Sequence, residues 1–134
     1  MTKSSMSGYV RRMKFTLDAR PGVNLIRAYS ASELRIGDQL ITSNCIVTAD
    51  TLITQWQPAV SAGMSVADLA PLLALDPQIV LWGTTQAVQA ASSGVRAALF
   101  AQAISLEAMD LGAACRTFNI LVQEERRVAA ALFL

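Results

Sequence analysis

Short apolar segments alternate with helical patterns through the second half of the chain, and this alternation restricts the fold most. Residues 78–82, QIVLW, are typical of a strand buried on both faces. Residues 104–109, ISLEAM, alternate with the period of a strand, and residues 127–134, RVAAALFL, predict another buried strand. Strands and helices in this order predict a βαβαβ half of an α/β domain.

The helix expected between the last two strands carries most of the polar residues of interest. Asp110 is a good N-cap, because its carboxylate can accept from the free amides of the first turn. One apolar face is formed by Leu111, Ala114, Cys115, Phe118 and Val122. A different stripe carries Gly112, Arg116, Asn119 and Gln123. We expect Cys115 to point into the core, the polar stripe to look outward or toward a groove, and the helix to end around residues 124–126.

The first half of the chain is rich in strand-forming residues. From Asn24 to Trp56 the pattern predicts a β-hairpin or meander, broken at 37–38 and 43–44. Ser65 and Asp68 have the spacing of a capping box, and Pro71 predicts that the helix they open is short or kinked. Residues 86–102 predict one broken helix or two short ones.

Length and composition place the chain among compact, well-packed proteins. At 134 residues it predicts a single α/β domain over residues 23–134, preceded by a flexible basic tail over residues 1–22. The tail lacks the apolar block of a secretory signal, and no apolar stretch is long enough to span a bilayer. We therefore expect a cytoplasmic protein. A net charge of +1 gives no reason to expect a nucleic acid partner.

Several chemistries conflict with the residue inventory. The chain has no histidine, which excludes a Cys/His dyad and a Ser/His/Asp triad within one subunit. Cys45 and Cys115 lack the C-x-x-C spacing of a zinc site, and the carboxylates form no calcium-loop motif. Neither phosphate-binding glycine motif is present. We therefore predict no catalytic residues, no metal ligands and no cofactor.

One candidate site remains, at the ends of two predicted strands. Gly83 and Thr84 follow the first strand and Asp110 follows the second. If these strands are parallel neighbours, a crevice forms at their carboxyl ends, where α/β proteins commonly bind ligands. Thr84, Arg116 and Asn119 would line it, and Gly83 would let a ligand or another chain approach the backbone. The alternative is that residues 83–84 form an ordinary turn and Arg116 is solvated.

Three segments resemble a known family: LWGT at 81–84, MDLGAACRTFN at 109–119 and RRVAAAL at 126–132. They are similar to the domain of unknown function 498 family, which includes uncharacterised bacterial proteins and the mitochondrial complex I assembly factor 3. The resemblance implies a three-layer α/β domain around a mixed sheet, and action through protein contacts. The matching positions are Gly83, Thr84, Asp110, Ala113, Ala114, Cys115, Arg116, Thr117 and Asn119. Thr85 and Leu111 depart from the family pattern, which weakens the case for a small-ligand pocket.

Three functions follow in order of support. The first is a non-enzymatic protein-interaction domain that assists the assembly or stability of a larger, respiratory-type complex. The second is a small-ligand or anion-binding domain that uses the crevice, although Asp110 would repel an anion there. An enzyme ranks third. The candidate binding or interaction residues are Gly83, Thr84, Asp110, Arg116, Thr117 and Asn119. A protein partner is expected, while its identity and the oligomeric state are open.

Overall fold

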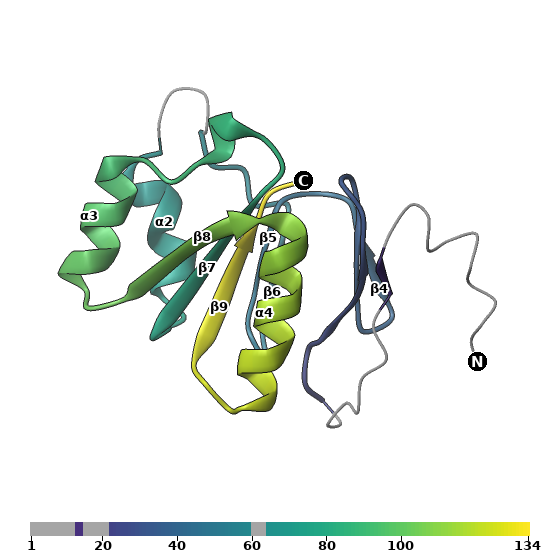
Figure 1. The fold of residues 1–134 in the computed structure, drawn as a ribbon. Helices are drawn as coiled ribbons and strands as arrows, with labels where there is room; N and C mark the ends of the chain where they lie inside the picture. The colour runs from purple at the N-terminus through teal and green to yellow at the C-terminus, as the bar shows by residue number, and fades with distance from the viewer. Residues whose placement is uncertain (1–12, 15–21, 60–63) are drawn as a thin grey trace.

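The computed structural model describes residues 13–14, 22–59 and 64–134, which form two β-sheets and the helices that pack on them (Figure 1). The small sheet comes from the N-terminal part of the chain. The larger, five-stranded sheet contains strands from both halves. The tail expected over residues 1–22 falls largely outside the described residues. Within it, Met13–Lys14 form strand β1, which pairs with β2.

The small sheet is antiparallel, with the order β1-β2-β3-β4. Its further strands are β2 (Ile26–Tyr29), β3 (Leu34–Ile36) and β4 (Gln39–Ile41). The predicted break at residues 37–38 is the turn between β3 and β4. Gly37 has a φ of 58° there, a conformation that glycine adopts without the steric cost of a Cβ.

The larger sheet has the order β6-β5-β9-β7-β8 and is mixed. Its strands are β5 (Cys45–Val47), β6 (Leu52–Thr54), β7 (Ile79–Thr84), β8 (Ser105–Asp110) and β9 (Val128–Leu132). β7 runs parallel to both β8 and β9, whereas β5 is antiparallel to β6 and β9. All residues of β9 are buried, as predicted from its apolar run. The mixed α/β fold predicted from the sequence is confirmed.

The strand-rich segment 24–56 divides between the two sheets, although we expected one hairpin or meander. The division lies at the predicted break, residues 43–44. The Asn44 side chain there accepts a hydrogen bond from the backbone N–H of Leu134, at 3.0 Å. β5 is buried along its whole length, whereas β3 has one partly buried position and β4 has two exposed positions. A strand without a polar face is stable only inside a covered sheet, which explains why β5 pairs with β9.

Helices cover both faces of the larger sheet. α2 (Val66–Leu73) and α3 (Ser93–Ala101) lie on one face, and α4 (Leu111–Gln123) lies on the other (Figure 1). The capping box of Ser65 and Asp68 is confirmed, and α2 is short, as Pro71 predicted. The segment 86–102 forms two short helices, the 3₁₀ helix η1 (Ala87–Gln89) and α3.

The position of α4 matters most for the candidate site. The small sheet stands on the side of α4 away from the five-stranded sheet, to its right in Figure 1. One apolar cluster therefore joins α4 to both sheets, including Ile26, Cys115 and Phe118. A second cluster lies under α2 and α3, where Trp56, Trp82 and Phe133 contact one another with ring centroids 5.0–6.0 Å apart. α4 consequently has two buried faces.

Candidate functional site

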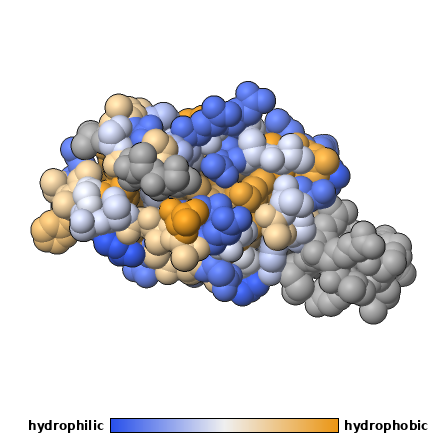
Figure 2. All heavy atoms as spheres, turned by 90° about the horizontal axis from the view of Figure 1, so that it is seen from above, coloured by the Kyte–Doolittle hydropathy of each residue, from blue (hydrophilic) through white to orange (hydrophobic). Residues whose placement is uncertain are grey.

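The two strand ends predicted to frame a crevice do lie together. β7 and β8 are parallel neighbours, and Thr84 pairs directly with Asp110 in their register. Gly83 precedes Thr84, and α4 begins immediately after Asp110. The view onto this end of the molecule shows hydrophilic and hydrophobic residues intermixed (Figure 2). The strand geometry required for a crevice is therefore present.

Asp110 uses its carboxylate to begin α4. Its backbone is extended, with φ −68° and ψ 164°, and its Oδ1 accepts from the N–H of Ala113 at 2.8 Å. This is the N-cap predicted from the sequence. The side chain remains exposed and brings a negative charge to the same helix end that would otherwise attract an anion.

The space above Gly83 is filled by α4. A Cβ at Gly83 would lie 2.6 Å from the Cβ of Ala114 and 3.0 Å from Cδ2 of Leu132. Real Cβ atoms do not approach one another so closely. The absent side chain thus allows α4 to pack directly on β7. The close approach that we expected at Gly83 is made by a helix of the same chain.

Gln89, which was not among the predicted site residues, closes the loop that follows β7. It is buried, and its Oε1 accepts from the backbone N–H groups of Thr85 and Gln86 at 2.7 and 3.0 Å. The hydroxyl of Thr85 donates to the same oxygen at 3.1 Å. The indole N–H of Trp82 donates to the backbone carbonyl of Gln89 at 2.7 Å. A buried tryptophan needs a hydrogen-bond acceptor for its indole N–H. Trp82, in an apolar segment just before a turn, was therefore the sequence signal for a contact with the loop.

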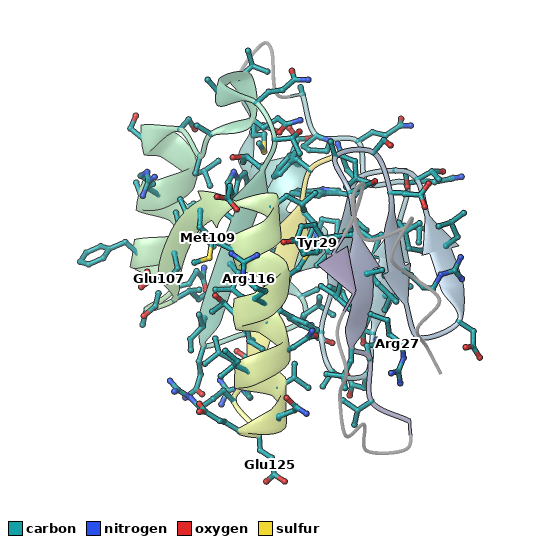
Figure 3. All side chains as sticks on the ribbon, turned by 45° about the vertical axis from the view of Figure 1, so that its right-hand side comes forward. Arg27, Tyr29, Glu107, Met109, Arg116 and Glu125 are labelled. Atoms are coloured by element: carbon teal, nitrogen blue, oxygen red, sulfur yellow. The ribbon has the colours of Figure 1, made fainter. Side chains whose placement is uncertain are left out.

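Arg116 is exposed on α4, as expected, but it is not an isolated side chain. Its Nη1 donates to the hydroxyl of Tyr29 on β2, at 2.6 Å. Figure 3 shows the two side chains across the boundary between α4 and the small sheet. Gly112 makes room for this arrangement, because a Cβ there would lie 2.7 Å from the Tyr29 hydroxyl oxygen. Arg116 therefore marks the junction of α4 with the small sheet.

Asn119 is enclosed between α4 and β2, so the expectation that it would look outward or toward a groove is wrong. It is 3% exposed and faces β2. Its Oδ1 accepts from the N–H of Ile26, and its Nδ2 donates to the carbonyl of the same residue, each at 2.9 Å. The reason is that the small sheet buries a second face of α4. A single-face helical pattern could not indicate this contact.

The six predicted site residues consequently fall into separate surroundings. Gly83, Thr84 and Asp110 lie at the strand ends, Arg116 contacts Tyr29, and Asn119 is enclosed. Thr117 is partly buried and donates from its Oγ1 to Sδ of Met109 at 3.6 Å. The side chains of Asp110, Arg116 and Asn119 each have a different partner within the protein. These side chains connect elements of the fold to one another, and they do not point together into one pocket.

Both cysteines are buried, free thiols in the cluster that contains α4. Burial raises the pKa of Cys45 from 9.0 to about 12. Burial, followed by the neighbouring Cys45, also raises the pKa of Cys115, against a smaller lowering by Arg116. A reactive thiol requires the thiolate near neutral pH. These surroundings favour the neutral thiol, as expected for side chains that pack in a core.

Within residues 13–14, 22–59 and 64–134, no three histidine, cysteine, aspartate or glutamate residues are grouped so that they could hold a metal ion. In the same part of the chain, no helix has the length and apolar character needed to cross a membrane.

Comparison with known proteins agrees with this architecture. An assembly factor 3 of the NADH dehydrogenase [ubiquinone] 1 alpha subcomplex from Danio rerio is 31% identical over 110 residues, covering 81% of this chain and 63% of that protein. The Xenopus tropicalis protein of the same name is 28% identical over 109 residues, covering 80% and 59%. The chain thus spans less than two thirds of these relatives.

A Xanthomonas campestris protein solved by NMR has a similar fold, with a TM-score of 0.72 and 30% identity. The alignment covers 89% of this chain and 92% of that protein. The family match covers residues 26–133 and thus includes strands β2 to β9 and the described helices α2, α3 and α4. The chain therefore belongs to the family described as a protein of unknown function, DUF498/DUF598.

Proposed function

We propose that this chain is a non-enzymatic protein-interaction domain that assists the assembly or stability of a larger, respiratory-type complex in the cytoplasm. The support from relatives is that two of them are named as assembly factors of the NADH dehydrogenase alpha subcomplex. The support from chemistry is that the chain has no histidine and that both thiols are buried. Protein contact needs neither a nucleophile nor a metal.

The observation that carries this proposal is the exposed side of α4. Arg116 and Ile120 are one helical turn apart, and Ile120 is 56% exposed. Arginine is enriched at protein interfaces, and the exposed Ile120 beside it supplies apolar area that a partner would bury. Tyr29 holds the Arg116 guanidinium by a hydrogen bond, which reduces the rotamer entropy lost when a partner binds.

The alternative function, ligand or anion binding in the crevice, has less support. Ala114 fills the space above Gly83, and Gln89 accepts the hydrogen bonds of the loop N–H groups. Those N–H groups are the donors that an anion would have required. The charge of Asp110 at the start of α4 also opposes an anion. For these reasons the interaction surface on α4 is preferred.

The test is affinity purification from the native host after mild cross-linking, with the Arg116→Ala/Ile120→Ser variant beside the wild type. We expect subunits or assembly intermediates of the respiratory complex to co-purify with the wild type and to be lost with the variant. Val88→Ser is the matched control, because Val88 is 60% exposed on a different element. Recovery of the same complex with the α4 variant as with the wild type would reject this surface. Recovery of no respiratory subunit with any of them would reject the function.

A further inference from the structure

Strand β8 forms one edge of the five-stranded sheet. It pairs with β7 on one side, and in the described part of the chain no strand pairs with its other side. The N–H of Ser105 donates to Gln78 at 3.0 Å, so Ser105 directs its backbone toward β7. Successive residues of a strand direct their N–H and C=O groups to opposite sides. The backbone groups of Leu106 and Ala108 therefore point toward the outer edge.

This edge has few of the features that prevent pairing with another strand. Edge strands are commonly protected by proline, lysine, bulges or very short length. β8 has six residues, pairs with β7 without a register shift, and contains neither proline nor lysine. Its charged residues are Glu107 and Asp110, and Asp110 is already the N-cap of α4. The outer edge of β8 is consequently suited to strand addition.

Exposed apolar surface lies next to the beginning of the same strand. Phe100, near the end of α3, is 85% exposed. A groove of about 530 Å³ beside it is lined by Arg96, Phe100, Ala103, Ile104, Ser105 and Leu106. Both Ile104 and Leu106 also pack partly against the cluster under α2 and α3. A partner strand that pairs with β8 would therefore bring its neighbouring residues over Phe100.

We propose that the occupant is a second copy of this chain, whose β8 pairs antiparallel with β8 about a two-fold axis. A two-fold axis perpendicular to the sheet requires antiparallel pairing of the same strand, and such isologous contacts are the commonest in homo-oligomers. The two larger sheets then become one continuous sheet. A net charge of only +1 per chain means that two copies do not repel each other strongly.

The charges on β8 select the register of this pairing. If Glu107 were opposite its own copy, two carboxylates would meet, which destabilises a strand pair. If the axis passed at Ala108, Asp110 would lie opposite the apolar Leu106. With the axis at Leu106, Leu106 faces its own copy and Glu107 lies opposite Ser105 of the second copy. The register with the axis at Leu106 avoids both of these unfavourable pairings.

In the same register, the second copy also covers the exposed side chain of Phe100. Phe100 and Ile104 precede β8 and line the groove with Leu106. An axis at Leu106 places the two grooves beside each other on the α3 side of the joined sheet. The two Phe100 side chains are then shielded together. Registers displaced toward the end of β8 move the two grooves apart and leave Phe100 in water.

The association is tested by sedimentation equilibrium of purified chains. We expect the wild type to be dimeric, and Phe100→Ser to weaken the dimer by about tenfold or more. Ala108→Pro should abolish it, because proline removes one N–H that points outward. Val88→Ser removes another exposed apolar side chain, which lies on η1, and should leave the dimer unchanged. A wild type that stays monomeric into the millimolar range would overturn the proposal. The outer edge of β8 would then be expected to pair with a strand of a different protein.

The register is tested with Ser105→Cys and Glu107→Cys, each alone and mixed in equal amounts under mild oxidation. Directly opposite residues of a non-hydrogen-bonded pair have Cα atoms about 4.5 Å apart, which permits a disulfide. We expect a covalent dimer in the mixture and none in either variant alone. The native Cys45 and Cys115 are buried and should not interfere. Cross-linking of Glu107→Cys alone would contradict the proposed register.

Discussion

The side chain of Asn119 on α4 forms two hydrogen bonds with the backbone of Ile26 on β2, each 2.9 Å long. Ile26 is fully buried and lies 93 residues away in sequence. The amide thus completes the backbone hydrogen bonds of a strand as a neighbouring strand would. This contact attaches the small sheet to α4, and through α4 to the rest of the domain.

Replacement of Asn119 should therefore destabilise the whole domain. Asn119→Ala leaves the N–H and C=O of Ile26 buried without these partners, and we expect a loss of roughly 2–4 kcal/mol in the free energy of unfolding. Asn119→Asp should cost at least as much, because the carboxylate would face the Ile26 carbonyl. Urea denaturation followed by fluorescence of Trp56 and Trp82 measures both. Arg116→Ala is the control on the same helix, and its exposed side chain should contribute about 1 kcal/mol or less. Equal losses for Asn119→Ala and Arg116→Ala would contradict this account.

Substitution of Gly83 tests the packing of α4 on β7. Gly83→Ala places a Cβ 2.6 Å from that of Ala114, and we expect a loss of about 1–3 kcal/mol from overpacking. Adding Ala114→Gly removes the clashing atom at a helix-propensity cost of about 1 kcal/mol. A double-mutant cycle should therefore give a favourable coupling between the two substitutions. Strictly additive effects would show that Gly83 is not required for this contact.

Gln89 provides a test of the loop after β7. Gln89→Ala removes the acceptor used by two backbone N–H groups and one hydroxyl, and we expect a loss of roughly 1–3 kcal/mol. Gln102→Ala, an exposed glutamine at the end of α3, is the control and should change stability by about 0.5 kcal/mol or less. Thermal unfolding of the two variants beside the wild type distinguishes them. A loss for Gln89→Ala no larger than that of the control would remove the structural role given to this residue.

Because both thiols are buried, we expect the free energy of unfolding of the domain to fall at alkaline pH. Burial raises the pKa of Cys45 from 9.0 to about 12 and raises that of Cys115 as well, so the folded chain holds both protons more tightly than the unfolded chain. The contribution of the two protonated thiols to the free energy of unfolding is fully present below pH 9 and is lost as the pH rises toward 12. Each thiol should lower the free energy of unfolding by up to about 1.4 kcal/mol per pH unit in that window. Urea denaturation between pH 7 and 10 measures this slope. Cys45→Ala/Cys115→Ala should reduce it, and an unchanged slope would show that the thiols are not its source.

Much of the fold could be predicted from local patterns. The apolar segments that became β7, β8 and β9, the Asp110 cap and the inward-facing Cys115 depend on periodicity and on hydrogen bonds close in sequence. Short-range rules of this kind are expressed directly in the order of residues. The resemblance to the DUF498/DUF598 family rested on the same segments and is confirmed.

Other features depended on which elements meet. The sequence of α4 displays one apolar face, and nothing in its periodicity indicates that β2 would enclose Asn119 or that Tyr29 would bind Arg116. Likewise, Gly83 is equally compatible with an open crevice and with the close packing of Ala114 that the structure contains. Chain order by itself determined the strands of the second half, the caps and the residue types available for chemistry. Only the tertiary structure decided which polar side chains became internal links, because those contacts join residues far apart in sequence and depend on how two sheets pack around one helix.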